Sequence, residues 1–149
     1  MLGAISARRN VGTLGSHCML MAATMLPAIS GCFGSPPAAL KPVASPDGTW
    51  VVTPSVNRSK ADRTTYLCIA FEVTDAAGNP LHQVQSNAND RMKWALGWYD
   101  NDTIVLASSD VGTSAWQLTA NGSISQLPDS LPAEITAHAQ RLTDAKYGP

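Results

Sequence analysis

Apolar and polar residues alternate over most of the chain after residue 48, in short runs that end at turn residues. The clearest run is "TTYLCIAFEVTD" (64–75), in which every second position is strongly apolar. These positions are Leu67, Ile69, Phe71 and Val73. Alternation over this length predicts a β-strand with one buried face. The turn "DAAGNP" follows, and "LHQVQS" (81–86) predicts the strand that returns in a hairpin.

Similar runs predict the other strands. A Ser-Pro-Asp-Gly turn (45–48) precedes the first of them, and Asn121-Gly122 has the composition of a tight turn between the last two. We expect these strands at 49–52, 92–98, 103–107, 114–119 and 123–127. Short strands joined by short turns predict a mainly β (α+β) domain, an antiparallel β meander of about six to seven strands.

The last segment has a different period. In "AEITAHAQRLTDAK", Ile135, Ala139 and Leu142 recur at helical spacing, while Pro132 suits a first turn and Gly148 a stop. One C-terminal helix is therefore expected to cover one face of the sheet. The other face of an antiparallel sheet can remain in contact with water or a partner.

The N-terminal part has a layout of its own. The segment from Cys18 to Ile29 is apolar on all sides, follows Arg8 and Arg9, and is shorter than the roughly 20 residues that a membrane-spanning helix needs. This layout is typical of a secretory signal peptide. A buried amphipathic helix is the alternative, but it would show one apolar stripe and would not contain Pro27. The paired arginines also suit the twin-arginine export route, although the polar residues after them match that signal poorly.

The four residues Ile29-Ser30-Gly31-Cys32 resemble the lipobox of bacterial lipoproteins. The resemblance implies cleavage between Gly31 and Cys32, a diacylglyceryl group on the Cys32 thiol, and an acyl chain such as palmitate on the new amino terminus. Two or more acyl chains hold a protein stably on a membrane without a spanning helix. Phe33 stands where an aspartate would resemble an inner-membrane retention signal, and this favours the outer membrane.

These features divide the chain into three parts. Residues 1–31 are the expected lipoprotein signal peptide, and residues 32–46 are the lipidated cysteine and a tether rich in Pro, Ala and Ser. A segment of that composition buries too little apolar surface to offset its ordering entropy. Residues 47–149 form the expected β-rich domain. Its opening turn resembles the strand starts of β-propeller blades, but the motif occurs once, so no propeller is expected.

Charge and cysteine content narrow the function. The mature chain would carry eight Lys or Arg against eleven Asp or Glu, whereas a nucleic-acid-binding domain needs a basic footprint. The expected partners are therefore the membrane, through the lipid, and a protein of the periplasm or envelope, with no nucleic acid. Cys18 would leave with the signal peptide and Cys32 would carry lipid, so Cys68 is expected to be a free thiol.

Catalytic and metal-binding patterns are scarce. His82 and His138 stand in no nucleophile or zinc pattern, and Asp100 and Asp102 lack the glycine and the glutamate of a calcium loop. The sequence therefore predicts no catalytic residue, no metal and no cofactor other than covalent lipid on Cys32. A binding protein is favoured over an enzyme.

The candidate binding residues lie in and near the loop "SSDVGT" (108–113). Loops on a rigid sheet often carry recognition, and Gly112 allows a backbone geometry that other residues resist. Trp116 would be an aromatic anchor beside the loop. In the alternative, Gly112 only completes a turn and Trp116 belongs to the core. The candidate set is Ser109, Asp110, Val111, Gly112, Trp116 and Tyr99.

Three segments resemble a group of small bacterial envelope lipoproteins: "SPDGTW", "EVTDAAGNPL" and "ALGWYDNDTIVLASSDVGTSAWQL". Some lipoproteins of this size and topology are immunity proteins, which neutralise effectors delivered into the periplasm. The resemblance implies a membrane-anchored, non-catalytic protein-binding module, with an immunity protein against a secreted effector as the specific case. An envelope sugar-binding domain or a small hydrolase is the alternative.

Overall fold

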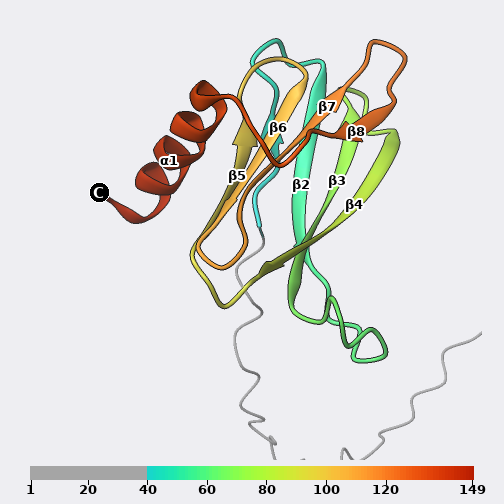
Figure 1. The fold of residues 1–149 in the computed structure, drawn as a ribbon. Helices are drawn as coiled ribbons and strands as arrows, with labels where there is room; N and C mark the ends of the chain where they lie inside the picture. The colour runs from blue at the N-terminus through green and yellow to red at the C-terminus, as the bar shows by residue number, and fades with distance from the viewer. Residues whose placement is uncertain (1–39) are drawn as a thin grey trace, which may run out of the picture. The chain divides into compact units, whose positions relative to one another are not determined.

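The computed structural model describes residues 40–149, which form two four-stranded antiparallel sheets and one helix (Figure 1). Sheet A contains β1 (Val43–Ala44), β2 (Trp50–Val56), β3 (Cys68–Asp75) and β4 (Pro80–Asn89). Sheet B contains β5 (Trp94–Trp98), β6 (Thr103–Ser108), β7 (Gly112–Leu118) and β8 (Ile124–Gln126), and the helix α1 (Ala133–Tyr147) follows it. The prediction of a mainly β domain with antiparallel neighbours and one C-terminal helix is confirmed, with eight strands in place of six to seven.

The eight strands form two layers where the sequence predicted a single meander. Each sheet keeps its strands in chain order, and the chain passes from one sheet to the other through residues 90–93. Met92, expected in a strand, lies in this turn and is exposed. Alternation gives each strand an inner face but does not say which strands share a layer. The two apolar faces pack together because each must be buried against another layer.

The core between the sheets contains residues from both of them. Phe71 of β3 meets Trp116 of β7 edge to face, with ring centroids 5.0 Å apart and planes at 74°. Edge-to-face contact is a favourable geometry for aromatic rings. The other buried members of this core are Val52, Ile69, Val73, Ala88, Trp94, Trp98, Ile104, Leu106 and Leu118.

The helix α1 covers the outer face of sheet B. Leu142 packs over Gly97 of β5, where an added Cβ would lie 2.8 Å from Leu142 Cδ2. β6 is apolar at most positions because this strand is covered on both faces. The buried residues of this second core are Val105, Ala107 and Ala115 of sheet B with Ile135 and Ala139 of α1.

The open face of the domain is therefore the outer face of sheet A. The prediction that α1 would leave the other face of its own sheet open was wrong, since sheet A covers that face. The outer face of sheet A is polar along a row that crosses three strands, where Thr53, Glu72 and Gln83 lie side by side. Such a face suits contact with water.

The connections between strands divide into two ends. The distal end, uppermost in Figure 1, carries the turns at 45–49, 76–79, 99–102 and 119–123. The basal end carries the connections at 57–67, 90–93 and 109–111. Hydrogen bonds join the sheets at both ends. The Asn89 N–H donates to Asp110 Oδ2 at 3.0 Å at the basal end, and His82 Nε2 hydrogen-bonds with the Gly122 carbonyl at the distal end.

The folded domain begins before Asp47, the boundary expected from the sequence. The indole Nε1 of Trp98 donates to the Val43 carbonyl at 2.9 Å, and Leu40 packs against the core. Residues 40–46, expected in the tether, therefore belong to the domain. β1 has only two residues, and they pair with β2. The Pro, Ala and Ser content of the segment does not reveal so short a strand.

The described part of the chain starts in the basal half of the domain. β1 runs antiparallel to β2, with Val43 opposite Val52, so residues 40–42 run toward the basal end of β2. The expected signal peptide, the cleavage site after Gly31 and the lipidation site Cys32 lie outside the described residues.

Candidate functional site

The loop between β6 and β7 is held by its own aspartate. Asp110 accepts the Asn89 N–H at 3.0 Å and the Ser108 hydroxyl, and the Ser109 N–H donates to the Lys93 carbonyl at 2.9 Å. Burial acts to raise the pKa of Asp110, but the hydrogen bonds from Ser108 and Asn89 outweigh burial and hold this pKa below its usual range. Asp110 therefore shapes the loop and is not a free charge at its tip.

The tip of this loop consists of small and apolar residues. Val111 is 48% exposed, and Ser109 and Gly112 are exposed beside it. Gly112 has φ +80°, a left-handed conformation that side chains resist, and a Cβ there would meet no atom within 4 Å. Gly112 is thus required by the turn, while Val111 is the exposed apolar side chain of the loop.

The structure does not bring Trp116 and Tyr99 to this loop. Trp116 is 5% exposed and points into the core, which matches the alternative considered from the sequence. Tyr99 lies at the distal end and stacks edge to face on His138 of α1, with centroids 5.6 Å apart. The expected binding set is therefore split, and only Ser109 to Gly112 form one surface.

A basal cluster that the sequence did not indicate joins the end of α1 to β5. The Lys146 ammonium donates to the Trp94 carbonyl at 2.7 Å and lies 3.4 Å from the centroid of the Trp94 ring. The Tyr147 hydroxyl donates to the same carbonyl at 3.0 Å and accepts the Trp94 N–H at 3.2 Å. Lys93 Nζ lies 5.6 Å from the Tyr147 ring. These contacts fix the last turn of the helix and leave Tyr147 41% exposed.

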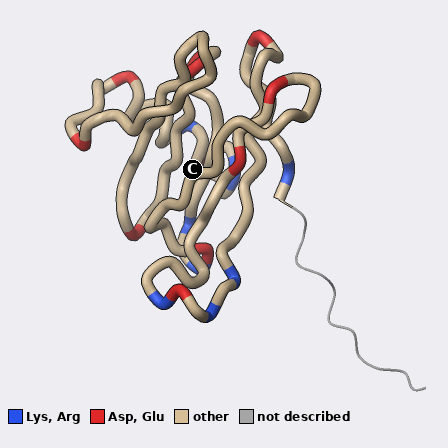
Figure 2. The backbone as a smooth tube through the Cα atoms, turned by 90° about the vertical axis from the view of Figure 1, so that its right-hand side faces the viewer, with Lys and Arg blue, Asp and Glu red and all other residues tan. Residues whose placement is uncertain are grey.

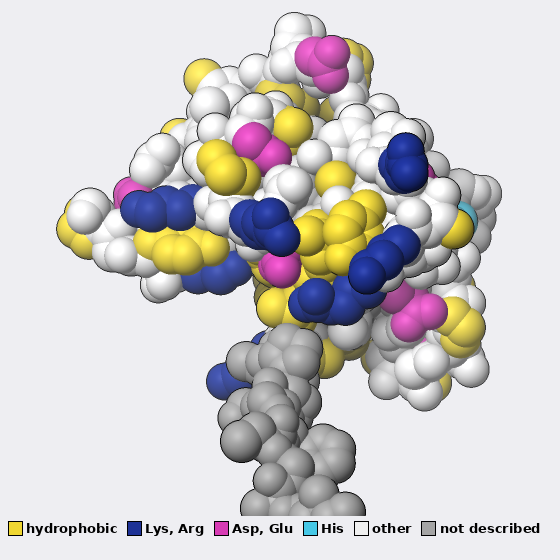
Figure 3. Space-filling model, turned by 90° about the horizontal axis from the view of Figure 1, so that it is seen from below, with side chains coloured by type: hydrophobic (Ala, Val, Ile, Leu, Met, Phe, Trp, Pro, Cys, Tyr) yellow, Lys and Arg dark blue, Asp and Glu magenta, His cyan; other side chains and the backbone are white. Residues whose placement is uncertain are grey.

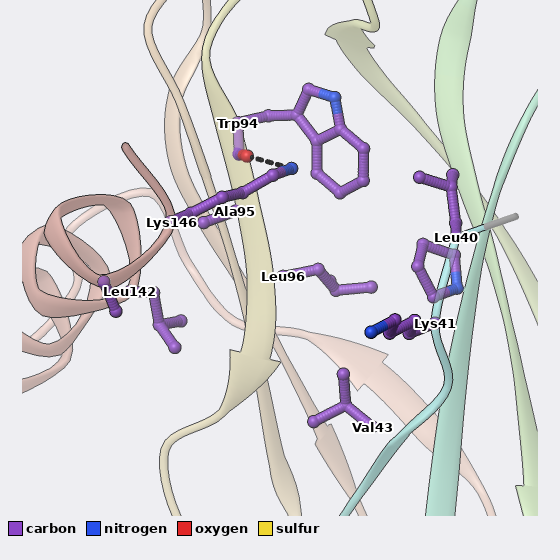
Figure 4. Close-up of a pocket in the computed structure, with 10 residues that line it drawn as sticks. Leu40, Lys41, Val43, Trp94, Ala95, Leu96, Leu142 and Lys146 are labelled. Atoms are coloured by element: carbon purple, nitrogen blue, oxygen red, sulfur yellow. Dashed lines mark hydrogen bonds between the residues drawn. The ribbon is translucent and has the colours of Figure 1, made fainter. Parts of the chain in front are cut away.

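A pocket of about 320 Å³ opens beside this cluster (Figure 4). Its walls come from the segment before β2, from β5 and from the last turns of α1, and most of them are apolar. The charged groups that line it are Lys41 and Lys146, and the Lys146 ammonium is bound to the Trp94 carbonyl (Figure 4). The lining residues are Leu40, Lys41, Val43, Pro54, Trp94, Ala95, Leu96, Leu142, Ala145 and Lys146.

Two aspartates at the distal end have opposite pKa shifts. Asp100 accepts the N–H groups of Asp102 at 3.1 Å and Thr103 at 2.7 Å. Burial acts to raise the pKa of Asp100, but these hydrogen bonds outweigh burial and hold it below its usual range. Burial, and then the neighbouring Asp100, raise the pKa of Asp102. Within residues 40–149, no three His, Cys, Asp or Glu side chains are grouped as a metal site would need.

Two further titratable groups lie below the surface: Cys68 is buried and His138 is half-buried. Cys68 is 6% exposed, its thiol lies 3.6 Å from the Asn87 carbonyl, and burial raises its pKa. Burial, and then Arg141, lower the pKa of His138, whose Nε2 is buried without a hydrogen-bond partner among the described residues. His138 is therefore less exposed than a residue on the outer side of a helix would be.

The comparisons with known proteins give no further assignment. No family model, no curated protein and no solved structure matches the chain. Within residues 40–149, no helix has both the length and the hydropathy to cross a membrane.

Proposed function

We propose that the chain is the precursor of a bacterial lipoprotein, anchored in an envelope membrane through Cys32, whose domain acts as a non-catalytic protein-binding module. The anchor rests on the lipobox resemblance at Ile29 to Cys32 and on the short apolar segment before it. The outer membrane is favoured by Phe33. Because residues 40–42 run toward the basal end, the distal end is the one free to meet a partner in the envelope.

The observation that carries the binding role is a depression of about 530 Å³ at the distal end. Three turns surround it, and its apolar groups include Trp50, which is half-buried, and Leu81, which is 37% exposed. An aromatic group in a concave surface is a frequent anchor of protein interfaces. The lining residues are Thr49, Trp50, Asp75, Ala76, Ala77, Leu81, Ala120, Asn121 and Gly122.

Two of the turns around this depression are held by hydrogen bonds to their own aspartates. Asp75 accepts the N–H groups of Ala77 at 2.9 Å and Asn79 at 2.8 Å, and the Asn79 side chain is the first cause that lowers the pKa of Asp75. Asp47 accepts the Thr49 N–H at 3.1 Å in the turn beside it. Turns that are already ordered lose little conformational entropy when they bind.

The charges of the distal end indicate the chemistry of the partner. The aspartates there are Asp47, Asp75, Asp100, Asp102 and, in the segment before α1, Asp129. The distal turns contain no Lys or Arg. An acidic surface is complementary to a basic one, so the partner is a protein with a basic contact surface. The resemblance to envelope lipoproteins makes a secreted effector the specific case.

The test is capture of an envelope protein by the mature chain, followed by its identification by mass spectrometry. Leu81→Lys places a positive charge in the depression, where it would repel a basic partner, and Met92→Lys places the same charge at the basal end on a residue that is 44% exposed. We expect Leu81→Lys to lose the captured protein and Met92→Lys to keep it, with both variants folded by circular dichroism. Equal capture by the two variants would contradict the proposal.

A further inference from the structure

Most of the Lys and Arg residues of the domain lie toward its basal end (Figure 2). Five of the eight Lys and Arg in residues 40–149 lie on two basal connections. These are Arg58, Lys60 and Arg63 between β2 and β3, and Arg91 and Lys93 between β4 and β5. Lys146 lies beside Trp94, the first residue of β5, and Lys41 shares a pocket with Pro54 near the end of β2. Five cationic groups thus lie on the basal connections, and Lys146 and Lys41 adjoin the parts of β5 and β2 that lead to this end.

These seven side chains define what we term the basal face, and all seven are exposed. The acidic groups on the basal connections are Asp62, Asp90 and Asp110. Asp62 accepts the Thr65 hydroxyl at 2.6 Å, and Asp110 holds the loop after β6. With seven Lys and Arg against these three Asp, the basal face carries more positive than negative charge, although the whole mature chain is acidic.

Exposed apolar side chains lie on the same face. Among the described residues, four large apolar side chains are exposed: Leu81 at the distal end, and Met92, Val111 and Tyr147 at the basal end. Seen from below, blue side chains lie across this face and around yellow ones (Figure 3). Lys93 and Lys146 lie near the Tyr147 ring, at 5.6 and 5.2 Å from its centroid. Cationic groups that surround apolar ones are typical of surfaces that lie on lipid headgroups.

We propose that the basal face docks on an anionic phospholipid bilayer. The Lys and Arg side chains contact headgroup phosphates, and Met92, Val111 and Tyr147 reach the boundary between headgroups and acyl chains. Salt screens charges beyond about 8 Å, so the bilayer meets the local charge of this face and not the net charge of the chain. The charges suit an anionic surface of any kind, but exposed apolar side chains among them favour a bilayer over a polyanion in water.

The position of the chain start agrees with this orientation. Cys32 precedes Leu40 by eight residues, a span of at most about 28 Å. A lipid on Cys32 would keep the basal half close to the membrane, and docking would then point the distal depression away from it. This orientation of the anchored protein rests on the proposed function, whereas the docking itself does not need the lipid.

The experiment uses residues 36–149, a fragment that contains both cores and lacks Cys32. Its binding is measured by co-sedimentation with vesicles of phosphatidylglycerol and phosphatidylethanolamine, and with vesicles in which phosphatidylcholine replaces phosphatidylglycerol. The test variant is Lys60→Gln/Arg63→Gln, since both residues are exposed. The control variant, Ser130→Glu/Ala133→Glu, makes the same change in net charge on exposed residues just before α1 and at its first position, outside the basal connections.

We expect binding to the anionic vesicles only, a decrease with added salt, and a loss of about 25-fold in Lys60→Gln/Arg63→Gln, about 5-fold for each charge. The control variant should bind as the parent does. Equal binding to both vesicle types, no binding, or equal loss in the two variants would overturn the proposal. Retention by polyglutamate without vesicle binding would also overturn it and would assign the face to an acidic protein. Whether Cys32 is lipidated in cells is a separate measurement that this result does not affect.

Discussion

The Asn89 N–H donates to the Asp110 carboxylate at 3.0 Å, and this bond joins the end of β4 in sheet A to the loop after β6 in sheet B. The two residues are 21 positions apart and belong to different layers. With the Ser108 hydroxyl as a second donor, Asp110 organises a connection on the basal face.

Asp110→Ala should therefore destabilise the domain by about 1 to 2 kcal/mol, because the Asn89 N–H and the Ser108 hydroxyl lose their acceptor. Urea unfolding followed by tryptophan fluorescence measures the change. Ser109→Ala, next to it in the loop, should change the free energy of unfolding by less than about 0.5 kcal/mol, as surface substitutions do. If the two variants are equally stable, the bond between the sheets contributes nothing.

Gly97 tests the packing of α1 on sheet B. A Cβ at this position would lie 2.8 Å from Leu142 Cδ2 and 3.3 Å from Leu142 Cδ1. Gly97→Ala should lower the free energy of unfolding by about 1 kcal/mol, the low end of the range for an overpacked contact, because the atoms that it meets are the ends of the half-buried Leu142 side chain, which can turn aside. In the double variant Gly97→Ala/Leu142→Ala, the added methyl group gains space, so its cost should fall. A cost for Gly97→Ala that is independent of the residue at 142 would show that the helix does not pack as described.

Substitution of Asp100 and of Asp102 should change the free energy of unfolding in opposite directions. The folded-state pKa of Asp102 is raised, so its charge opposes folding once the pH rises above that pKa. Asp102→Asn should raise the free energy of unfolding at neutral pH. This gain in stability should vanish as the pH falls below the ordinary pKa of aspartate. The folded-state pKa of Asp100 is lowered, so Asp100→Asn should destabilise at neutral pH and lose this effect as the pH falls through that pKa. Unfolding curves at several pH values measure both trends, and variants with the same sign would contradict the assignment.

Local patterns in the sequence predicted the elements well. Alternation at Ile69, Phe71 and Val73 predicted β3, and helical spacing at Ile135 and Ala139 predicted the face of α1 that packs on sheet B. The predicted first position of the long strand was less accurate. Leu67 alternates with Ile69 in the sequence, but in the structure it precedes β3 and has φ 64°.

The layering and the sites depended on contacts between distant segments. A period of two residues is the same for one sheet as for two, so the sequence did not separate sheet A from sheet B. The sequence allowed Trp116 to be either an exposed anchor beside the loop or a core residue, and its contact with Phe71 shows that it belongs to the core. The basal face combines residues from Lys41 to Lys146, whose proximity no local pattern reveals.

The central claim is that the domain is held on a membrane by lipid on Cys32, and intact-mass spectrometry of the protein extracted from membranes tests it most directly. We predict a chain that begins at Cys32, lacks residues 1–31 and carries the added mass of a diacylglyceryl group and an acyl chain. Cys32→Ser should accumulate as an uncleaved precursor. A mature chain with an unmodified Cys32, or one that retains residues 1–31, would contradict the account.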